Sequence, residues 1–234
     1  MDDQAHQTPP MFVFPRWANY ALPAILILVG GAGLYLPTVV GFGGSPKTTD
    51  VGYQPTQPVP FSHALHAGEL GMDCRYCHNT VEQAGFAAVP ATQTCMNCHT
   101  NIQRPDPAGN PAATLKPLYE SWQSGKPVNW VKVHDLPDYA YFNHSAHVNK
   151  GIGCVTCHGR IDQMDVVYQA KPLSMSWCLD CHREPEKYLR PVSEITNMNY
   201  SPPGGDQLAL GRQLKQQYGI RDRHYMESCS TCHR

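Results

Sequence analysis

The chain has few charged residues and no excess of either sign. Aspartate, glutamate, lysine and arginine make up 16% of its 234 residues, and the formal net charge is −1. A domain that binds nucleic acid needs a basic surface, so this balance excludes DNA and RNA as partners. Long regular elements are also not expected, because 21 prolines and 19 glycines favour turns. The residues present in unusual number are cysteine and histidine, with ten and twelve copies.

The ten cysteines all lie in one repeated pattern, Cys-x-x-Cys-His, and none is left over. Zinc sites, redox dithiols and iron–sulfur clusters also use Cys-x-x-Cys, but they need no histidine after it. At the frequency of histidine in this chain, about 5%, five such histidines would follow by chance with a probability of roughly 3 in 10 million, whereas covalent attachment of haem c requires each one. The five copies are Cys74, Cys77 and His78; Cys95, Cys98 and His99; Cys154, Cys157 and His158; Cys178, Cys181 and His182; and Cys229, Cys232 and His233.

The spacing of the pattern suits this chemistry. On a helical turn, positions i, i+3 and i+4 share one face, so two thiols can bond the porphyrin edge while the imidazole reaches the iron. The sequence therefore predicts five covalently bound haems c, each with its proximal histidine. The motif lacks the second axial ligand, which sets the potential and reactivity of the iron.

Two stretches repeat one another and contain further histidines. Residues 61–78 read FSHALHAGELGMDCRYCH, and residues 142–158 read FNHSAHVNKGIGCVTCH. A second motif follows each stretch, which indicates a duplicated two-haem unit over residues 61–99 and 142–182, with the fifth motif at 229–233. We expect one histidine of each upstream pair to bind its own module's haem and the other to cross to a neighbouring haem. These distal ligands are His63, His66, His144 and His147.

A fifth distal ligand is still needed. His134 is the first choice, Met175 is the rival because a thioether can be a sixth ligand, and His224 is a third candidate close to its own motif. His6 precedes the hydrophobic segment and has no expected role. With ligands enough for six-coordinate iron throughout, the sequence favours electron transfer over catalysis, since a saturated iron has no place for a substrate.

The amino-terminal part contains an uncharged stretch, ALPAILILVGGAGLYLPTVV, at residues 21–40. It is long enough to span a bilayer, and no small-residue cleavage site follows, so a retained signal anchor is expected at residues 17–42. Residues 1–16 would be a cytoplasmic tail and residues 43–60 a proline-rich and glycine-rich tether. Because bacteria attach haem c outside the cytoplasm, the haem domain at 61–234 would lie on the periplasmic face of the cell membrane.

The haem domain has too few residues for an ordinary core. It has about 35 residues per haem, so the porphyrins themselves are expected to form the core of a loop-rich fold with short α-helices and class III cytochrome-like modules. We expect a short helix near residues 118–122 within a long connection. The clearest helix is predicted at residues 206–219, where Leu210, Leu214 and Tyr218 form a stripe and Gly219 offers a C-terminal cap.

Several of these stretches together resemble one family. The single amino-terminal helix, FSHxxH, VHDLPDYAYFNHSAH, LSMSWCLDCHR and the terminal CSTCHR are similar to the pentahaem cytochrome c subunit of bacterial alternative complex III. The resemblance implies an electron-transfer subunit of a respiratory or photosynthetic quinol:acceptor oxidoreductase, not catalytic alone. It also implies polytopic quinol-binding subunits and an iron–sulfur subunit as partners, and a monohaem cytochrome c or copper protein as acceptor. One haem with histidine and methionine ligands is expected in this family, which keeps Met175 as a candidate at the fourth motif.

Two other functions are compatible with membrane-anchored haem motifs. A membrane-anchored quinol dehydrogenase of the tetrahaem type would use the same architecture and oxidise quinol directly, but the fifth haem and the tether count against it. A multihaem reductase would need an open iron, which the surplus of ligands disfavours.

Overall fold

The computed structural model describes residues 14–103 and 113–233, so His6 and most of the expected tail lie outside the described residues. The chain divides into two units, Met1–Thr48 and Thr49–Arg234. The described residues form helices and turns, with isolated bridges at Ala140 with His233 and at Ile152 with Leu189.

The first unit consists of one long helix, α1 (Ala18–Gly43), with no acidic or basic residue in it. Its 26 residues span about 39 Å at about 1.5 Å per residue, more than the hydrocarbon core of about 30 Å. Its mean hydropathy reaches 2.0, and none of its residues is buried. A helix that is apolar on all sides suits a membrane span, by length and composition.

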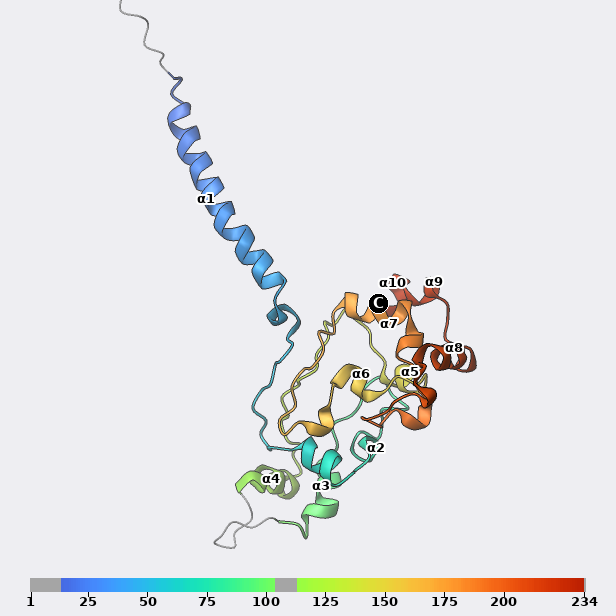
Figure 1. Cartoon of the computed structure of the whole chain (residues 1–234). Coiled ribbons are helices and arrows are strands. Elements are labelled where there is room, and N and C mark those ends of the chain that lie inside the picture. The colour runs from blue at the N-terminus through green and yellow to red at the C-terminus, as the bar shows by residue number, and fades with distance from the viewer. Residues whose placement is uncertain (1–13, 104–112, 234) are drawn as a thin grey trace, which may run out of the picture. The chain divides into compact units, whose positions relative to one another are not determined.

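The second unit is built from short helices joined by irregular segments (Figure 1). Five 3₁₀ turns and one π-helical turn, η2 (Ala64–Glu69), accompany them in the described part of this unit. In Figure 1, α3 and α4 lie at one end of this unit and α7, α9 and α10 at the other. The helices are α2 (Cys74–Cys77), α3 (Thr92–His99), α4 (Lys116–Ser124), α5 (His144–Val148), α6 (Cys154–His158), α7 (Met175–Arg183), α8 (Gln207–Gln217), α9 (Arg223–Met226) and α10 (Cys229–Cys232).

Side-chain caps fix where several of these short helices begin. The side chain of Asp73 accepts a hydrogen bond from the backbone of Arg75 at the start of α2, and Ser174 accepts one from Trp177 at the start of α7. Such caps satisfy amide groups that have no partner within the helix, and they matter most in helices this short. Further caps of the same kind come from Asn143, Asp206 and Asp222.

The helix predicted at residues 206–219 is confirmed as α8, and it packs on its own unit. Leu214 is buried, and the Gln207 side chain donates to the carbonyls of Glu186 and Leu189 at 3.0 and 2.8 Å. Gly219, with φ +58°, ends the helix in a Schellman motif: its amide bonds the carbonyl of residue 216, and the next amide bonds that of residue 215. Only glycine adopts this backbone conformation without strain.

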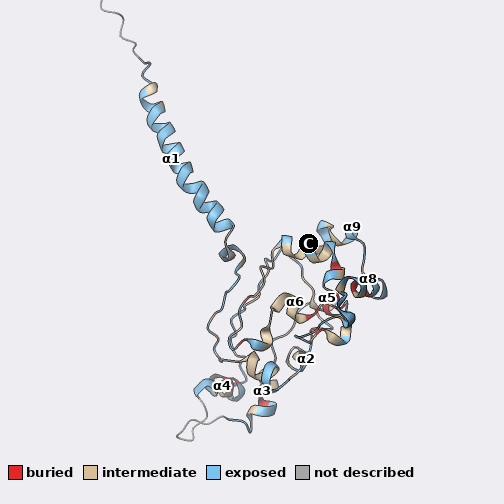
Figure 2. Cartoon of the chain, in the orientation of Figure 1, coloured by how far each residue is buried: buried red, intermediate tan, exposed pale blue. Residues whose placement is uncertain are grey.

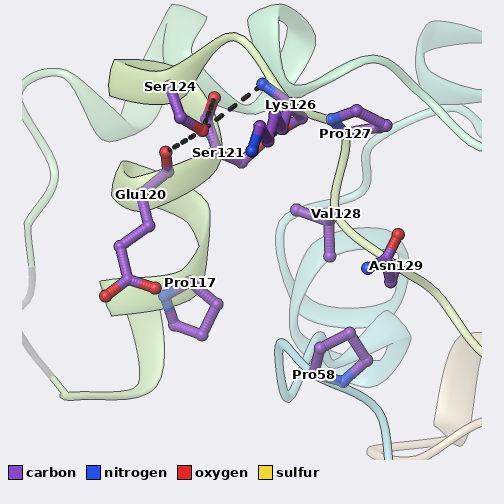
Figure 3. Close-up of a pocket in the computed structure, with 9 residues that line it drawn as sticks. All are labelled: Pro58, Pro117, Glu120, Ser121, Ser124, Lys126, Pro127, Val128 and Asn129. Atoms are coloured by element: carbon purple, nitrogen blue, oxygen red, sulfur yellow. Dashed lines mark hydrogen bonds between the residues drawn. The ribbon is translucent and has the colours of Figure 1, made fainter.

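The predicted helix near residues 118–122 is also present, as α4. Its end is fixed by Ser121, which donates to the carbonyl of Lys126, and by Ser124, which donates to that of Glu120 at 2.6 Å. A pocket between α4 and the segment around Pro58 is shown in Figure 3. Its lining contains no cysteine or histidine, so it is separate from the motifs.

The apolar core of the second unit is small. Buried positions appear in Figure 2 as short, scattered segments. Six of the nine buried hydrophobic residues among those described form two groups of three. One group is Val59, Met96 and Leu118, and the other is Val81, Val148 and Ile195. A unit of this length normally buries far more apolar surface, so the polypeptide alone does not supply a conventional core.

Candidate haem sites

Each Cys-x-x-Cys-His motif forms a helical turn, as the spacing predicts. The cysteines of the first and fifth motifs lie in α2 and α10, and His78 and His233 directly follow these helices. The third motif is α6, and the second and fourth motifs lie within α3 and α7. All ten cysteines are free thiols. Each motif therefore presents two thiols and one imidazole on one side of a turn, the arrangement that can hold a porphyrin by its edge and its iron.

The upstream histidines face the motif histidines in four pairs. The ring centroids of His63 and His78 lie 6.5 Å apart, and those of His66 and His99 lie 6.3 Å apart. The second module repeats these values, with 6.5 Å between His144 and His158 and 6.3 Å between His147 and His182. A metal–nitrogen bond of about 2.0 Å on each side, plus about 1.1 Å from nitrogen to ring centre, would place the centres of two axial imidazoles about 6.2 Å apart. The four gaps therefore fit an iron with two histidine ligands.

These pairings bear on which histidine serves which motif. In each module, the first upstream histidine faces the first motif and the second faces the second motif. The neighbouring haem to which the second histidine crosses would thus belong to the same module.

Hydrogen bonds leave the iron-binding nitrogen of most of these rings free. In His78 and His99, Nδ1 lies 2.8 Å from a backbone carbonyl oxygen, which can only accept. Nδ1 must then carry the proton, and Nε2 keeps a lone pair for a metal. The same bond to a carbonyl is made by His182, His233, His66, His144 and His147.

Phe61 and Phe142 hold the upstream histidines in the same way in both modules. The Phe61 ring stacks on His66 at 4.3 Å and meets His63 edge-on at 4.8 Å. The Phe142 ring stacks on His147 at 4.5 Å and meets His144 edge-on at 4.8 Å. The sequence shows an aromatic residue before each histidine pair, but its role as a support between the two rings required the structure.

Comparison with known proteins agrees with this geometry. Residues 59–113 and 140–234 match the family model described as cytochrome c7 and related cytochrome c. The chain belongs to this cytochrome family. Membership means that haem c is bound covalently, which accounts for the free thiols and for the imidazole pairs.

A curated relative matches part of this cytochrome. It is the "Menaquinone reductase, multiheme cytochrome c subunit" of Nitratidesulfovibrio vulgaris, 34% identical over 126 residues. The match covers 54% of this chain and 56% of the relative, so the cytochrome spans about half the length of the relative that it matches.

Burial favours the neutral form of several imidazoles in the two modules of the cytochrome. It lowers the pKa of His158 to about 3 and that of His63 to about 4, with nearby histidines as the further cause. It also lowers the pKa of His144 and His147. A histidine must be neutral to bind a metal, so these surroundings favour the ligand form.

The first and third motifs of the cytochrome lie side by side. The thiols of Cys74 and Cys154 lie close enough to interact with each other, and this interaction lowers the pKa of Cys74 and raises that of Cys154. His144 adds a second link between the modules, because its Nδ1 lies 3.0 Å from the carbonyl oxygen of Gly85. The two modules therefore form one packed unit.

The fifth motif lacks a facing histidine among the described residues. The Nδ1 of His233 donates to the carbonyl of Tyr139 at 3.0 Å, and the nearest described ring is that of Tyr139, at 5.9 Å. His134 lies elsewhere, with its ring 4.5 Å from His158, and His224 is exposed on α9.

Met175 is the remaining candidate for this position. It begins α7, and its side chain is 64% exposed. Burial raises the pKa of Cys178, one turn further along α7, and the nearby thiol of Cys232 adds to the effect. Met175 therefore lies on a helix that adjoins the fifth motif.

Proposed function

We propose that this cytochrome relays electrons within a quinol-oxidising membrane complex and that it holds five covalently bound haems c. The observation that carries the proposal is the set of four facing histidine pairs, 6.3–6.5 Å apart. Each pair fills both axial positions of an iron, which leaves no position for a substrate. Haem c supplies reversible one-electron chemistry when bound, and the protein's part is to hold, orient and shield it.

The ten cysteines and ten axial residues divide among five sites in this proposal. The histidines of the first four motifs pair with the upstream histidines that face them, so Met175 is not needed at the fourth motif, where His147 faces His182. Met175 is then free for the fifth motif, opposite His233. A thioether ligand there would raise the potential of that haem above those with two histidines.

The membrane part of the proposal rests on α1. Its length and composition suit a retained single-pass anchor, with a short cytoplasmic tail before it and the tether after it. The haem unit would lie on the extracytoplasmic face, because haem c is attached there in bacteria.

Two similarities support a role in a quinone-linked complex. The relative from Nitratidesulfovibrio vulgaris is named as a menaquinone reductase subunit, and the motifs resemble the pentahaem subunit of alternative complex III. The proposed partners are polytopic quinol-binding subunits, an iron–sulfur subunit, and a monohaem cytochrome c or copper protein as acceptor. We propose no reaction of this chain alone.

Binding of carbon monoxide tests whether each haem iron has two ligands from the protein. We expect five haems per chain by pyridine haemochrome assay, and a reduced spectrum that carbon monoxide leaves essentially unchanged, because both axial positions are filled. A stoichiometric spectral shift on adding the gas would contradict the relay and point to a catalytic iron.

Isolation from the native membrane tests the partners. In mild detergent, polytopic and iron–sulfur subunits should co-purify with the tagged cytochrome, and quinol oxidation should depend on them. If the cytochrome comes alone and quinol reduces it at a useful rate, it is a direct quinol dehydrogenase instead.

A further inference from the structure

We propose that His134 is a positioning residue for His158, the proximal histidine of the third motif, and that it binds no iron. This inference rests on the proposed function in one respect, namely that the third motif carries a haem.

The spacing of the two rings excludes an iron between them. The centroids of His134 and His158 lie 4.5 Å apart, and the ring planes cross at 73°. Two imidazoles on one iron need about 6.2 Å between their ring centres, because each metal–nitrogen bond is about 2.0 Å long and each nitrogen lies about 1.1 Å from its ring centre. His144 already has this relation to His158, at 6.5 Å. The His134 ring thus contacts the ring of His158 directly, while His144 is placed to hold the iron from the side opposite His158.

His158 differs from the other four proximal histidines in its hydrogen bonding. Each of those four places Nδ1 at 2.8–3.0 Å from a backbone carbonyl oxygen, as described above. The Nδ1 of His158 is buried and has no partner among the described residues. A buried donor without an acceptor costs about 1–3 kcal/mol, so native sites rarely leave one unpaired.

His134 has the complementary atom. Its Nε2 is also buried and also has no partner among the described residues. A neutral imidazole with its proton on Nδ1 has an acceptor lone pair at Nε2. Since the two rings are in contact, a small rotation of the His134 ring or one bridging water connects the two nitrogens. The His134 ring then accepts a hydrogen bond from Nδ1 of His158, just as a backbone carbonyl accepts one from Nδ1 of each of the other four proximal histidines.

This contact has an electronic consequence. An acceptor at Nδ1 fixes the ring orientation of a ligating histidine and raises its basicity. A more basic ligand stabilises the oxidised iron, so His134 holds the potential of the third haem down. Loss of the acceptor should raise that potential without changing the coordination number.

Three variants of the full-length, haem-loaded protein distinguish a positioning role of His134 from a role as an iron ligand. His134→Phe keeps a ring in contact with His158 but removes the acceptor, and His134→Gln keeps an acceptor. His144→Phe is the matched control, because it removes the residue that faces the same proximal histidine across the iron gap. Each variant is measured by haem content, low-temperature electron paramagnetic resonance, carbon monoxide binding and spectropotentiometric titration.

We expect His134→Phe to keep all haems low-spin and unreactive to carbon monoxide while one midpoint potential rises. A tenfold change in that one-electron equilibrium corresponds to about 59 mV. His134→Gln should restore most of the shift, and His144→Phe should yield one high-spin haem that binds carbon monoxide.

Each contrary result overturns a different part of the proposal. A high-spin haem in His134→Phe would show that His134 is an axial ligand, and unchanged potentials would show that it has no effect on His158. Mass spectrometry of the peptide that contains residues 154–158 tests the premise, because a peptide without haem in the unmodified protein overturns both this inference and the five-haem proposal. A haem on that peptide with unchanged potentials overturns the role of His134 alone.

Discussion

A hydrogen bond at Nδ1 selects the nitrogen with which a histidine can bind iron. His99 and His182 belong to different modules, yet each places Nδ1 2.8 Å from a carbonyl oxygen. The carbonyl of His182 comes from Met226, which lies 44 residues further along the chain. The motif thus provides the ring, while a distant segment of backbone fixes its tautomer and orientation.

The fifth motif allows a test at a single residue. Replacing Met175 by leucine removes the thioether with little change in volume, so we expect the fifth haem to become high-spin and to bind carbon monoxide after reduction. Its potential should fall, because a methionine ligand raises the potential of a haem. Titration and spectra of the full chain measure both effects.

Two controls accompany this variant. Met226→Leu changes a methionine near the same motifs whose carbonyl, not its side chain, bonds His182, and His224→Phe changes the exposed histidine on α9. Neither should alter the spin state. If His224→Phe alone produced a high-spin haem, His224 would be the fifth ligand in place of Met175.

At the scale of elements, the packing of α8 depends on a glycine. Gly211 is buried against the 3₁₀ turn η5 (Pro185–Lys187), and a Cβ there would lie 1.9 Å from the carbonyl oxygen of Glu186. The turn leads to Leu189, which is almost completely buried. The helix and the turn can therefore approach only because position 211 has no side chain.

Gly211→Ala should consequently destabilise the haem-loaded protein. Backbone atoms would have to move apart, and overpacking of this kind typically costs about 1–3 kcal/mol, even though alanine favours helix. For a protein of this size, that corresponds to a fall in Tm of about 2–12 °C. Thermal unfolding followed by circular dichroism measures it. Gln213→Ala, on the exposed side of the same helix, should leave Tm nearly unchanged, and equal Tm values for the two variants would contradict this account of the contact.

The sequence predicted where these helices form better than it predicted which side chains from distant segments meet. The helical turns of the motifs, α4 and α8 followed from spacing, turn residues and periodicity, all of which act over a few residues. The facing histidines could not be assigned in advance, because His66 meets His99 through contacts between separate segments. The position of His134 beside His158 could not be predicted either, since residues 24 apart in an irregular segment leave no periodic pattern.

At the scale of the whole haem unit, two small apolar groups take the place of one core. Leu189 and Ile195 are its largest fully buried side chains. Folding must offset the conformational entropy of all the ordered residues, and burial of so few side chains is too small for this. The apolar faces of the covalently bound porphyrins are the remaining source of buried surface.

The haems should therefore be required for folding, and to different degrees at different motifs. Serine at all ten cysteine positions should abolish the cooperative thermal transition, because the apolar groups that remain are too small to hold the unit together. Replacing only Cys229 and Cys232 should cost less, since α10 lies at one end of the unit and Cys229 is exposed (Figure 1). Replacing Cys154 and Cys157 should cost far more, because burial raises the pKa of Cys157 to about 12 and Cys154 contacts the first motif.

Thermal unfolding of these three variants and of the unmodified protein, followed by circular dichroism, ranks how much the haem at each motif contributes to stability. The expected order of Tm is the unmodified protein, then the fifth-motif variant, then the third-motif variant, with no transition when all ten cysteines are replaced. A cooperative transition in that last protein would mean that the polypeptide has a core of its own. An equal loss for the third and fifth motifs would mean that the haems contribute independently of burial, contrary to a fold in which the central haems replace the apolar core.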